Sequence, residues 1–168
     1  VFDTAEAKLN NCTIRNVLSH GCCAQSNAQL QLRGCSISNV GGCGILALGS
    51  STHVSLGECS LKEGHMHGVH ALEHACVVAE DCQMVQNGGC GALVTAEGVL
   101  DVTRCSSKVN RERGFWATGS SQMKLVDCKS RGDAWVGCGG DKGANVVGER
   151  VVVNCSSGSS SGRNCLSG

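Results

Sequence analysis

Proline is absent from this chain of 168 residues, although glycine (24) and cysteine (14) are abundant. Many glycines and cysteines without proline favour tight turns and small buried side chains over a disordered linker. A net charge is also absent, because 14 basic residues balance 14 acidic ones. This balance excludes a general electrostatic attraction to nucleic acid or to a charged membrane surface.

Long apolar runs are missing as well. None approaches the roughly 20 residues that a membrane-spanning helix needs, and the first residues do not resemble a signal peptide. The length predicts a single domain, residues 1–168. Because the sequence opens at Val1 without a methionine, we expect this domain to be a piece of a longer chain. The Gly-x-Ser-x-Gly and His-Glu-x-x-His motifs and the phosphate-binding loop are absent too.

What the chain does contain is an internal repeat. One cysteine per repeat stands at Cys12, Cys35, Cys59, Cys82, Cys105, Cys128 and Cys155, in steps of 23, 24, 23, 23, 23 and 27 residues. Apolar residues precede each of the first six by three and five positions, as Leu100 and Val102 precede Cys105. Further upstream, a glycine opens a short alternating segment such as Gly91-Ala92-Leu93-Val94. A fixed period of this length is typical of a solenoid.

Alternation with a period of two predicts strands instead of helices, and the frame of leucine-rich repeats is absent. Three short strands with their bends account for one repeat. The sequence therefore predicts an all-β parallel β-helix solenoid of about seven coils, each about 4.8 Å from the next, in a rod about 30–35 Å long.

The glycine, alternating strands and cysteine together resemble the right-handed parallel β-helix superfamily, which has the pectate-lyase-like fold. The resemblance covers nearly the whole chain and implies the fold. It leaves the function open, because the superfamily includes polysaccharide lyases, hydrolases, epimerases, tailspikes and non-catalytic recognition modules.

The repeated cysteines are expected to stack inside the solenoid as a ladder of reduced thiols. Side chains in register stay about 4.8 Å apart, whereas the Cβ atoms of a disulfide lie about 3.8 Å apart. A one-dimensional ladder is not tetrahedral and no Cys-x-x-Cys pair exists, so zinc is disfavoured. So many thiols without partners favour an intracellular reducing compartment over secretion.

Regular coils are expected over residues 1–130, followed by a diverged coil and loop over residues 131–168. The glycine-rich run from Gly137 to Gly143 is interpreted as a surface loop that lengthens the last step to 27 residues.

Residues with catalytic chemistry are sparse, and we predict no catalytic residues, no metal and no cofactor. Enzymes of the superfamily use clustered acidic residues, often with calcium, and a Lys or Arg base. Here Glu58, Asp81, Arg104 and Asp127 each precede a ladder cysteine in different coils and are interpreted as a solvated edge. His65 and His67 are weak candidates for metal ligands, because they share a face in an extended segment, but solvated histidines are the favoured interpretation.

One outward-facing column of side chains is apolar where a solvated face would be polar. We call it the outer stripe, and its predicted binding residues are Leu46, Leu48, His70, Leu72, Leu93, Trp116 and Trp135. Alternation predicts that both tryptophans point outward from the same strand position, one coil apart. An apolar stripe of this length marks either an interface or a face that a flanking segment covers.

These observations favour a non-catalytic β-helix scaffold or protein-binding module that docks through the outer stripe within a larger assembly. The alternative is a carbohydrate-active enzyme or a glycan-binding β-helix. The expected partner is a protein, or flanking chain, that covers the stripe and the open ends of the solenoid; carbohydrate remains an alternative, and no nucleic acid or membrane span is expected.

Overall fold

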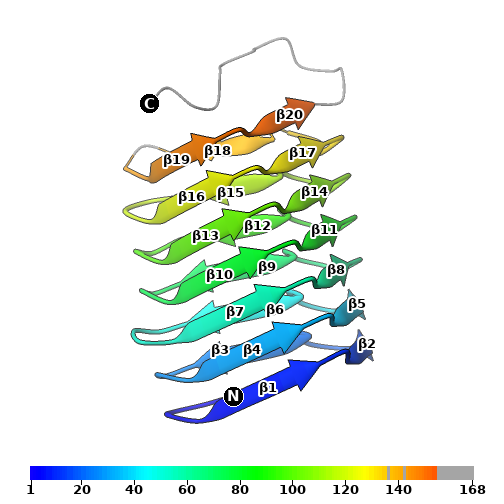
Figure 1. Cartoon of the computed structure of the whole chain (residues 1–168), viewed down its shortest axis with the longest axis vertical. Helices are drawn as coiled ribbons and strands as arrows, with labels where there is room; N and C mark the ends of the chain where they lie inside the picture. Colours follow the sequence, from blue (N-terminus) through cyan, green and yellow to red (C-terminus); the bar gives the residue numbers. More distant parts are fainter. Residues whose placement is uncertain (136, 142, 155–168) are drawn as a thin grey trace.

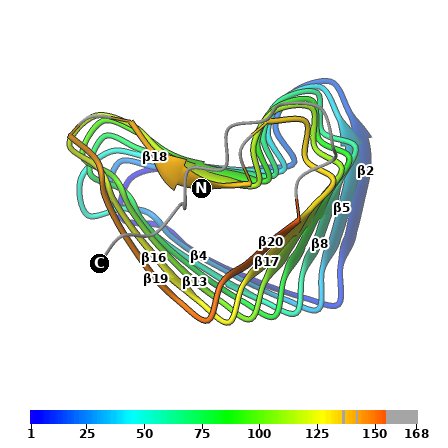
Figure 2. The ribbon, with the colours of Figure 1, turned by 90° about the horizontal axis from the view of Figure 1, so that it is seen from above.

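The computed structural model describes residues 1–135, 137–141 and 143–154. Twenty short strands and no helix are found in these residues, and the strands stack as flat coils along one axis (Figure 1). Seen along that axis, three sheets enclose a common interior (Figure 2). All pairings between strands are parallel, as the repeat predicts.

Each coil contributes one strand to each sheet. The first sheet contains β1 (Glu6–Asn10), β4 (Gln29–Arg33), β7 (His53–Gly57), β10 (Cys76–Glu80), β13 (Val99–Thr103), β16 (Gln122–Val126) and β19 (Asn145–Glu149). The second contains β2 (Thr13–Val17), β5 (Ser36–Val40), β8 (Ser60–Lys62), β11 (Gln83–Val85), β14 (Ser106–Lys108), β17 (Lys129–Arg131) and β20 (Val152–Asn154). The third contains β3 (Cys22–Gln25), β6 (Ile45–Leu48), β9 (Val69–Leu72), β12 (Ala92–Val94), β15 (Phe115–Ala117) and β18 (Cys138–Gly140).

The predicted fold class is confirmed, with a small difference in length. Two sheets have seven strands and the third has six, so the described residues form about six complete turns instead of seven. The period-two pattern fixes which side chains face inward: in β4, Leu30 and Leu32 are buried while Gln29, Gln31 and Arg33 are exposed. Repeating this alternation in each coil makes one continuous apolar interior.

A sharp bend joins the first sheet to the second in every coil. The residue at the bend has a positive φ, between 50° and 62°, in each case: Asn11, Gly34, Glu58, Asp81, Arg104, Asp127 and Arg150. Glycine, asparagine and aspartate tolerate the left-handed conformation, but it is unfavourable for Glu58, Arg104 and Arg150. The bend recurs because the register of the strands on both sides fixes it.

The cysteine after each bend points into the interior. Cys35, Cys59, Cys82, Cys105 and Cys128 are buried, whereas Cys12 in the first coil is half-buried. The backbone N–H of Cys59 donates to the Sγ of Cys82 at 3.4 Å, and that of Cys82 donates to the Sγ of Cys105 at 3.3 Å. All six thiols also donate to the carbonyl oxygen two residues earlier. The thiols of Cys82 and Cys105 thus each contact the backbone of the preceding coil.

The expected 27-residue step and diverged coil are wrong as far as Asn154. Lys129 pairs with Val152, so Val151 occupies the position after the bend that cysteines hold in earlier coils. Trp116 pairs with Gly139, and the same offset of 23 residues therefore continues through β18, β19 and β20. Gly137 takes the place of the glycine that opens the third-sheet strand, so no inserted loop is needed. Cys155 lies outside the described residues.

A second internal column is polar and was not predicted. Asn87, Asn110 and Asp133 recur at 23-residue intervals in the turn that follows the second sheet, and each is about 1% exposed. Asn110 Oδ1 accepts from the backbone N–H and the Nδ2 of Asn87 at 2.9 and 3.0 Å. Asp133 Oδ1 accepts from the same two groups of Asn110 at 2.9 and 2.8 Å. Ser107 and Ser130 also donate their hydroxyls to Asp133.

The thiol column leads to a first prediction. A hydrogen bond with the Cys105 thiol, followed by burial, raises the pKa of Cys82 from 9.0 to about 12. The native protein should therefore react slowly with alkylating reagents at pH 8, because the thiolate is the reactive form. After unfolding without reductant, thiol counting should recover nearly all of the 14 cysteines. Recovery of only a few would mean that disulfides form, contrary to the prediction.

The polar column leads to a second prediction. Asn110→Leu should lower the free energy of unfolding by roughly 3 kcal/mol, because it leaves Asp133 and the N–H of Asn87 buried without these hydrogen bonds. The matched control is Asn145→Leu, which places leucine at an exposed position of β19 and should change stability by less than about 0.5 kcal/mol. Urea unfolding followed by circular dichroism measures both. Equal losses of unfolding free energy in the two variants would show that the hydrogen bonds of the polar column do not stabilise the fold.

Candidate functional site

The outer face of the third sheet carries the predicted stripe. Register places Cys23, Leu46, His70, Leu93 and Trp116 at equivalent positions in five successive coils. The next outward position aligns Leu48 with Leu72. The leucines and His70 are half-buried, and Trp116 is only 9% exposed. These side chains cover one another along the stack, so the stripe is a continuous apolar strip and not a set of projecting residues.

The outer face of the first sheet is mainly polar, in contrast to the stripe on the third sheet. Its central outward column contains Lys8, Gln31, Ser55, Val78, Asp101, Lys124 and Val147 in successive coils. Five of these seven residues are polar or charged. The corresponding column of the third sheet has one ionisable ring, His70, between leucines. The apolar character therefore belongs to the third sheet and not to every outer face.

The expected position of Trp135 is wrong. Gly139, not Trp135, pairs with Trp116 in the next coil. Trp135 lies in the turn before β18, where its backbone N–H donates to the carbonyl of Glu112, and it is 61% exposed. The error follows from placing the alternation four residues too early, with Ala134 at the position that Cys138 occupies. A Cβ at Gly139 would lie 3.0 Å from the Trp116 ring, so this glycine leaves room for the ring.

Trp116 and Trp135 nevertheless both face the side chain of one arginine, Arg113. The Cζ atom of Arg113 lies 3.9 Å from the centroid of the Trp116 ring and 5.4 Å from that of Trp135. No ion pair of Arg113 is found among the described residues, and its Nε and the Nε1 of Trp116 are buried without a hydrogen-bond partner there. Sequence reasoning missed Arg113 because it precedes the glycine at which the alternating strand pattern begins.

Two of the histidines that were expected to be solvated, His67 and His70, are less exposed than this expectation requires. His65 is exposed, whereas His67 and His70, the latter within the stripe, are half-buried with ring centroids 5.2 Å apart. Burial lowers the pKa of His67, and burial together with the neighbouring histidines lowers the pKa of His70 from 6.5 to about 4. At neutral pH His70 is thus an uncharged part of an apolar surface.

His67 also belongs to a group with metal-ligand chemistry, together with Cys90 and Glu112; one ligand atom of each lies within 4.8 Å of the others. However, His67 Nδ1 accepts a hydrogen bond from the backbone N–H of Cys90 at 2.9 Å, which occupies that lone pair and leaves the proton on Nε2. His20 and Cys43 repeat this contact two coils earlier. A metal would have to displace a contact that the fold uses twice, and His65 does not join the group.

The acidic residues at the bend form ion pairs, most of them between coils. Arg104 binds Asp81 at 2.8 Å and Glu80, Arg150 binds Asp127 and Glu149, and Arg33 binds Glu58. All these side chains are exposed, so each pair contributes little to stability. The side-chain hydrogen bonds from Arg104 and Arg150 lower the pKa of Asp81 and Asp127, respectively. These carboxylates are thus held ionised at the surface.

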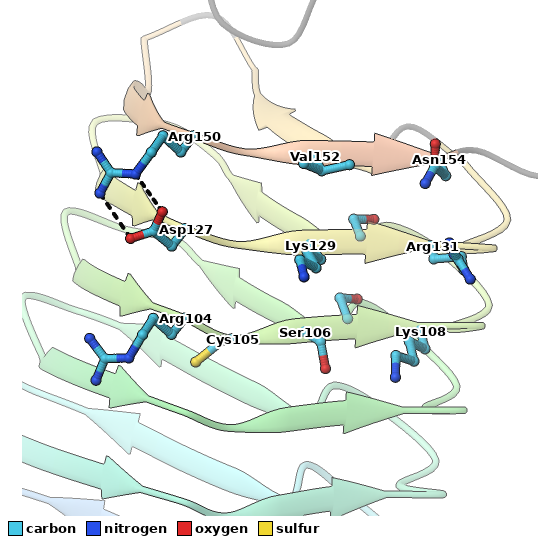
Figure 3. Close-up of a pocket in the computed structure, with 12 residues that line it drawn as sticks. Arg104, Cys105, Ser106, Lys108, Asp127, Lys129, Arg131, Arg150, Val152 and Asn154 are labelled. Carbon is cyan, nitrogen blue, oxygen red and sulfur yellow. Dashed lines mark hydrogen bonds and ion pairs between the residues drawn. The ribbon is translucent and has the colours of Figure 1, made fainter.

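A basic groove lies beside this bend, over β14, β17 and β20 (Figure 3). It has a volume of about 800 Å³, and its lining includes Lys108, Lys129 and Arg131. Arg131 pairs in register with Lys108, and Lys129 lies two residues earlier on the same strand and face. Within the described part of the chain these three cations have no ion-pair partner, whereas Arg150 beside them is bound to Asp127. The groove can attract an anionic group.

Comparison with known proteins agrees with this architecture. The model of the right handed beta helix region matches residues 1–164. The chain belongs to the right-handed β-helix family. No curated protein and no solved structure matches it.

Family membership of this β-helix fixes the direction of winding but not the ligand. Among residues 1–154 as described, two surfaces have chemistry beyond the fold itself: the outer stripe with its Arg113–tryptophan cluster, and the basic groove on the second sheet. They lie on different sheets, so their contributions can be tested separately. None of the described segments is a helix that is long and apolar enough to cross a membrane.

The lowered pKa of His70 leads to a third prediction. Because the unfolded chain binds the proton near pH 6.5 and the folded chain only near pH 4, stability should fall as the pH falls through this window. One unit of pKa difference corresponds to about 1.4 kcal/mol, so the effect is measurable. Urea unfolding at pH 7 and pH 5 should show a smaller loss for His70→Leu than for the wild type. Parallel losses would show that His70 ionises normally.

Proposed function

We propose that this β-helix is a non-catalytic binding module that docks a protein partner through the outer stripe. The observation that carries the proposal is the run of apolar outward residues on the third sheet, at positions where the first sheet carries mainly polar ones. Burying such a surface against a partner is favourable because it removes apolar area from water. The free thiols favour a reducing compartment as the place of action.

The stripe has the properties of a protein interface. It rests on strands that are paired on both sides and ends at two tryptophans and an arginine, residue types that are enriched in interface hot spots. A rigid sheet also loses little conformational entropy when a partner covers it.

The test is a comparison of matched surface variants. Leu46→Ser and Leu93→Ser remove apolar side chains from the stripe, and Val78→Ser makes a similar change on the exposed face of the first sheet. A protein captured by the wild type from its native source should bind each stripe variant about tenfold more weakly, a loss of about 1.4 kcal/mol. Val78→Ser should bind normally.

Urea unfolding of all three variants separates lost binding from lost folding. If a captured protein binds the stripe variants as tightly as it binds the wild type, the stripe is not its docking surface. Binding that falls equally in Val78→Ser would indicate nonspecific adhesion and would also contradict the proposal.

A second candidate function, glycan binding, is favoured by the basic groove. Three cations without ion-pair partners among the described residues suit the carboxylates or sulfates of an anionic oligosaccharide. Lys129→Glu should abolish binding of such an oligosaccharide, while Lys124→Glu on the first sheet should not. This candidate fails if no anionic oligosaccharide binds the wild type at millimolar concentration.

A further inference from the structure

Arg113 is a cation held in place without a counter-charge in the described structure. Its guanidinium is stacked on Trp116 and faces Trp135, and no carboxylate pairs with it among the described residues. Glu112, its neighbour in sequence, is instead within 3.5 Å of the Cys90 thiol. A planar guanidinium fixed between aromatic rings is preorganised to bind a carboxylate through two parallel hydrogen bonds.

The surroundings of Arg113 strengthen such an ion pair. The Trp116 ring is almost completely buried and covers one side of the guanidinium, which lowers the local dielectric constant. Two buried donors at the same place, Arg113 Nε and Trp116 Nε1, have no acceptor among the described residues. Because these two atoms are buried, a partner on the surface would bind the terminal nitrogens of the Arg113 guanidinium.

The spacing of the outer stripe specifies the shape of the partner. Leu46, His70, Leu93 and Trp116 follow one another at the coil spacing of about 4.8 Å, a span of about 14 Å. An α-helix rises about 1.5 Å per residue, so residues i, i+3, i+7 and i+10 lie about 4.5–6 Å apart along one face. A helix laid along the stack, across the strands, would place one apolar side chain over each coil.

The chemistry of the stripe fits an apolar helix better than a sugar chain. Saccharides require hydrogen-bond partners for their hydroxyls, and the stripe consists of leucines, a buried indole and His70, whose Nε2 already lies 3.2 Å from Thr95 Oγ1. The strands beneath are paired on both sides from β6 to β15, so their backbone is not available to a partner strand.

We propose that the partner docks an amphipathic helix along the outer stripe and places one acidic side chain on Arg113, between Trp116 and Trp135. This rests on the proposed function and adds the class of partner. The apolar face of the helix covers Leu46 to Trp116, and the Asp or Glu lies within one turn of the end that reaches Trp116.

The experiment uses two synthetic helical peptides of about 15 residues, roughly 22 Å long, with leucines at i, i+3, i+7 and i+10. One peptide carries a single glutamate in its first turn, where it also stabilises the helix, and the other carries glutamine there. Dissociation constants come from fluorescence anisotropy of labelled peptide. Intrinsic fluorescence reports directly on the site, because Trp116 and Trp135 are the two tryptophans of the chain.

The wild-type protein should bind the glutamate peptide at least tenfold more tightly than the glutamine peptide, and this preference should weaken at high salt. Arg113→Gln should abolish the preference. The matched control is Arg111→Gln, which removes the same charge from an exposed position of the same turn and should retain it. Leu93→Ser should weaken both peptides equally. Circular dichroism and urea unfolding confirm that each variant is folded.

The outcomes separate the two proposals. If both peptides bind through Leu93 with equal affinity, the acidic anchor is wrong and the stripe remains a docking surface. If Leu93→Ser changes neither affinity, the stripe itself is not used. Failure of the glutamate peptide to bind at all, or a preference that Arg111→Gln also abolishes, overturns the role of Arg113. A uronic-acid trisaccharide that changes tryptophan fluorescence only when Arg113 is present would replace the helix by a glycan.

Discussion

Stacking in strict register is the constraint on which the other features of this molecule depend. A residue has equivalent residues above and below it at about 4.8 Å, so each position in the coil becomes a column. A column is stable only if like residues tolerate one another. Aliphatic side chains and thiols stack on one another in the interior, and asparagines stack by forming hydrogen bonds from coil to coil. At the bend, charged residues stack because they alternate in sign, as in the series Asp81, Arg104, Asp127 and Arg150.

The same constraint explains why several bend residues have a conformation that suits them poorly. Glu58, Arg104 and Arg150 have positive φ values, although the isolated preferences of these residue types oppose them. The strands on either side are paired with those of neighbouring coils, and the turn that joins them has no other path. The many hydrogen bonds of the sheets thus outweigh the backbone preferences of the individual bend residues. The ion pairs at the bend add little to this stabilisation.

Periodicity made most of the fold predictable, because inward residues such as Leu100 and Val102 repeat with few exceptions. It failed where two signals competed. Cys155 and Trp135 are conspicuous residues of the kinds found in earlier coils, but the register follows Val151 and Gly139 instead. Asn87, Asn110 and Asp133 have a regular spacing that could have been found in the sequence. The stacking of Arg113 could not, because it depends on side-chain conformations in a turn.

The internal polar column also has a chemical direction. Gly64 donates to Asn87, Asn87 to Asn110 and Asn110 to Asp133, so in each step an N–H of one coil meets an oxygen of the coil that follows. The donor in each of these steps is a backbone N–H, which every residue except proline supplies, so only the acceptor depends on the side chain. A coil could therefore be duplicated within this series as long as its residue at this position carries a side-chain carbonyl or carboxylate oxygen. An aliphatic residue there would interrupt the series, because the N–H of the coil before it would lose its acceptor.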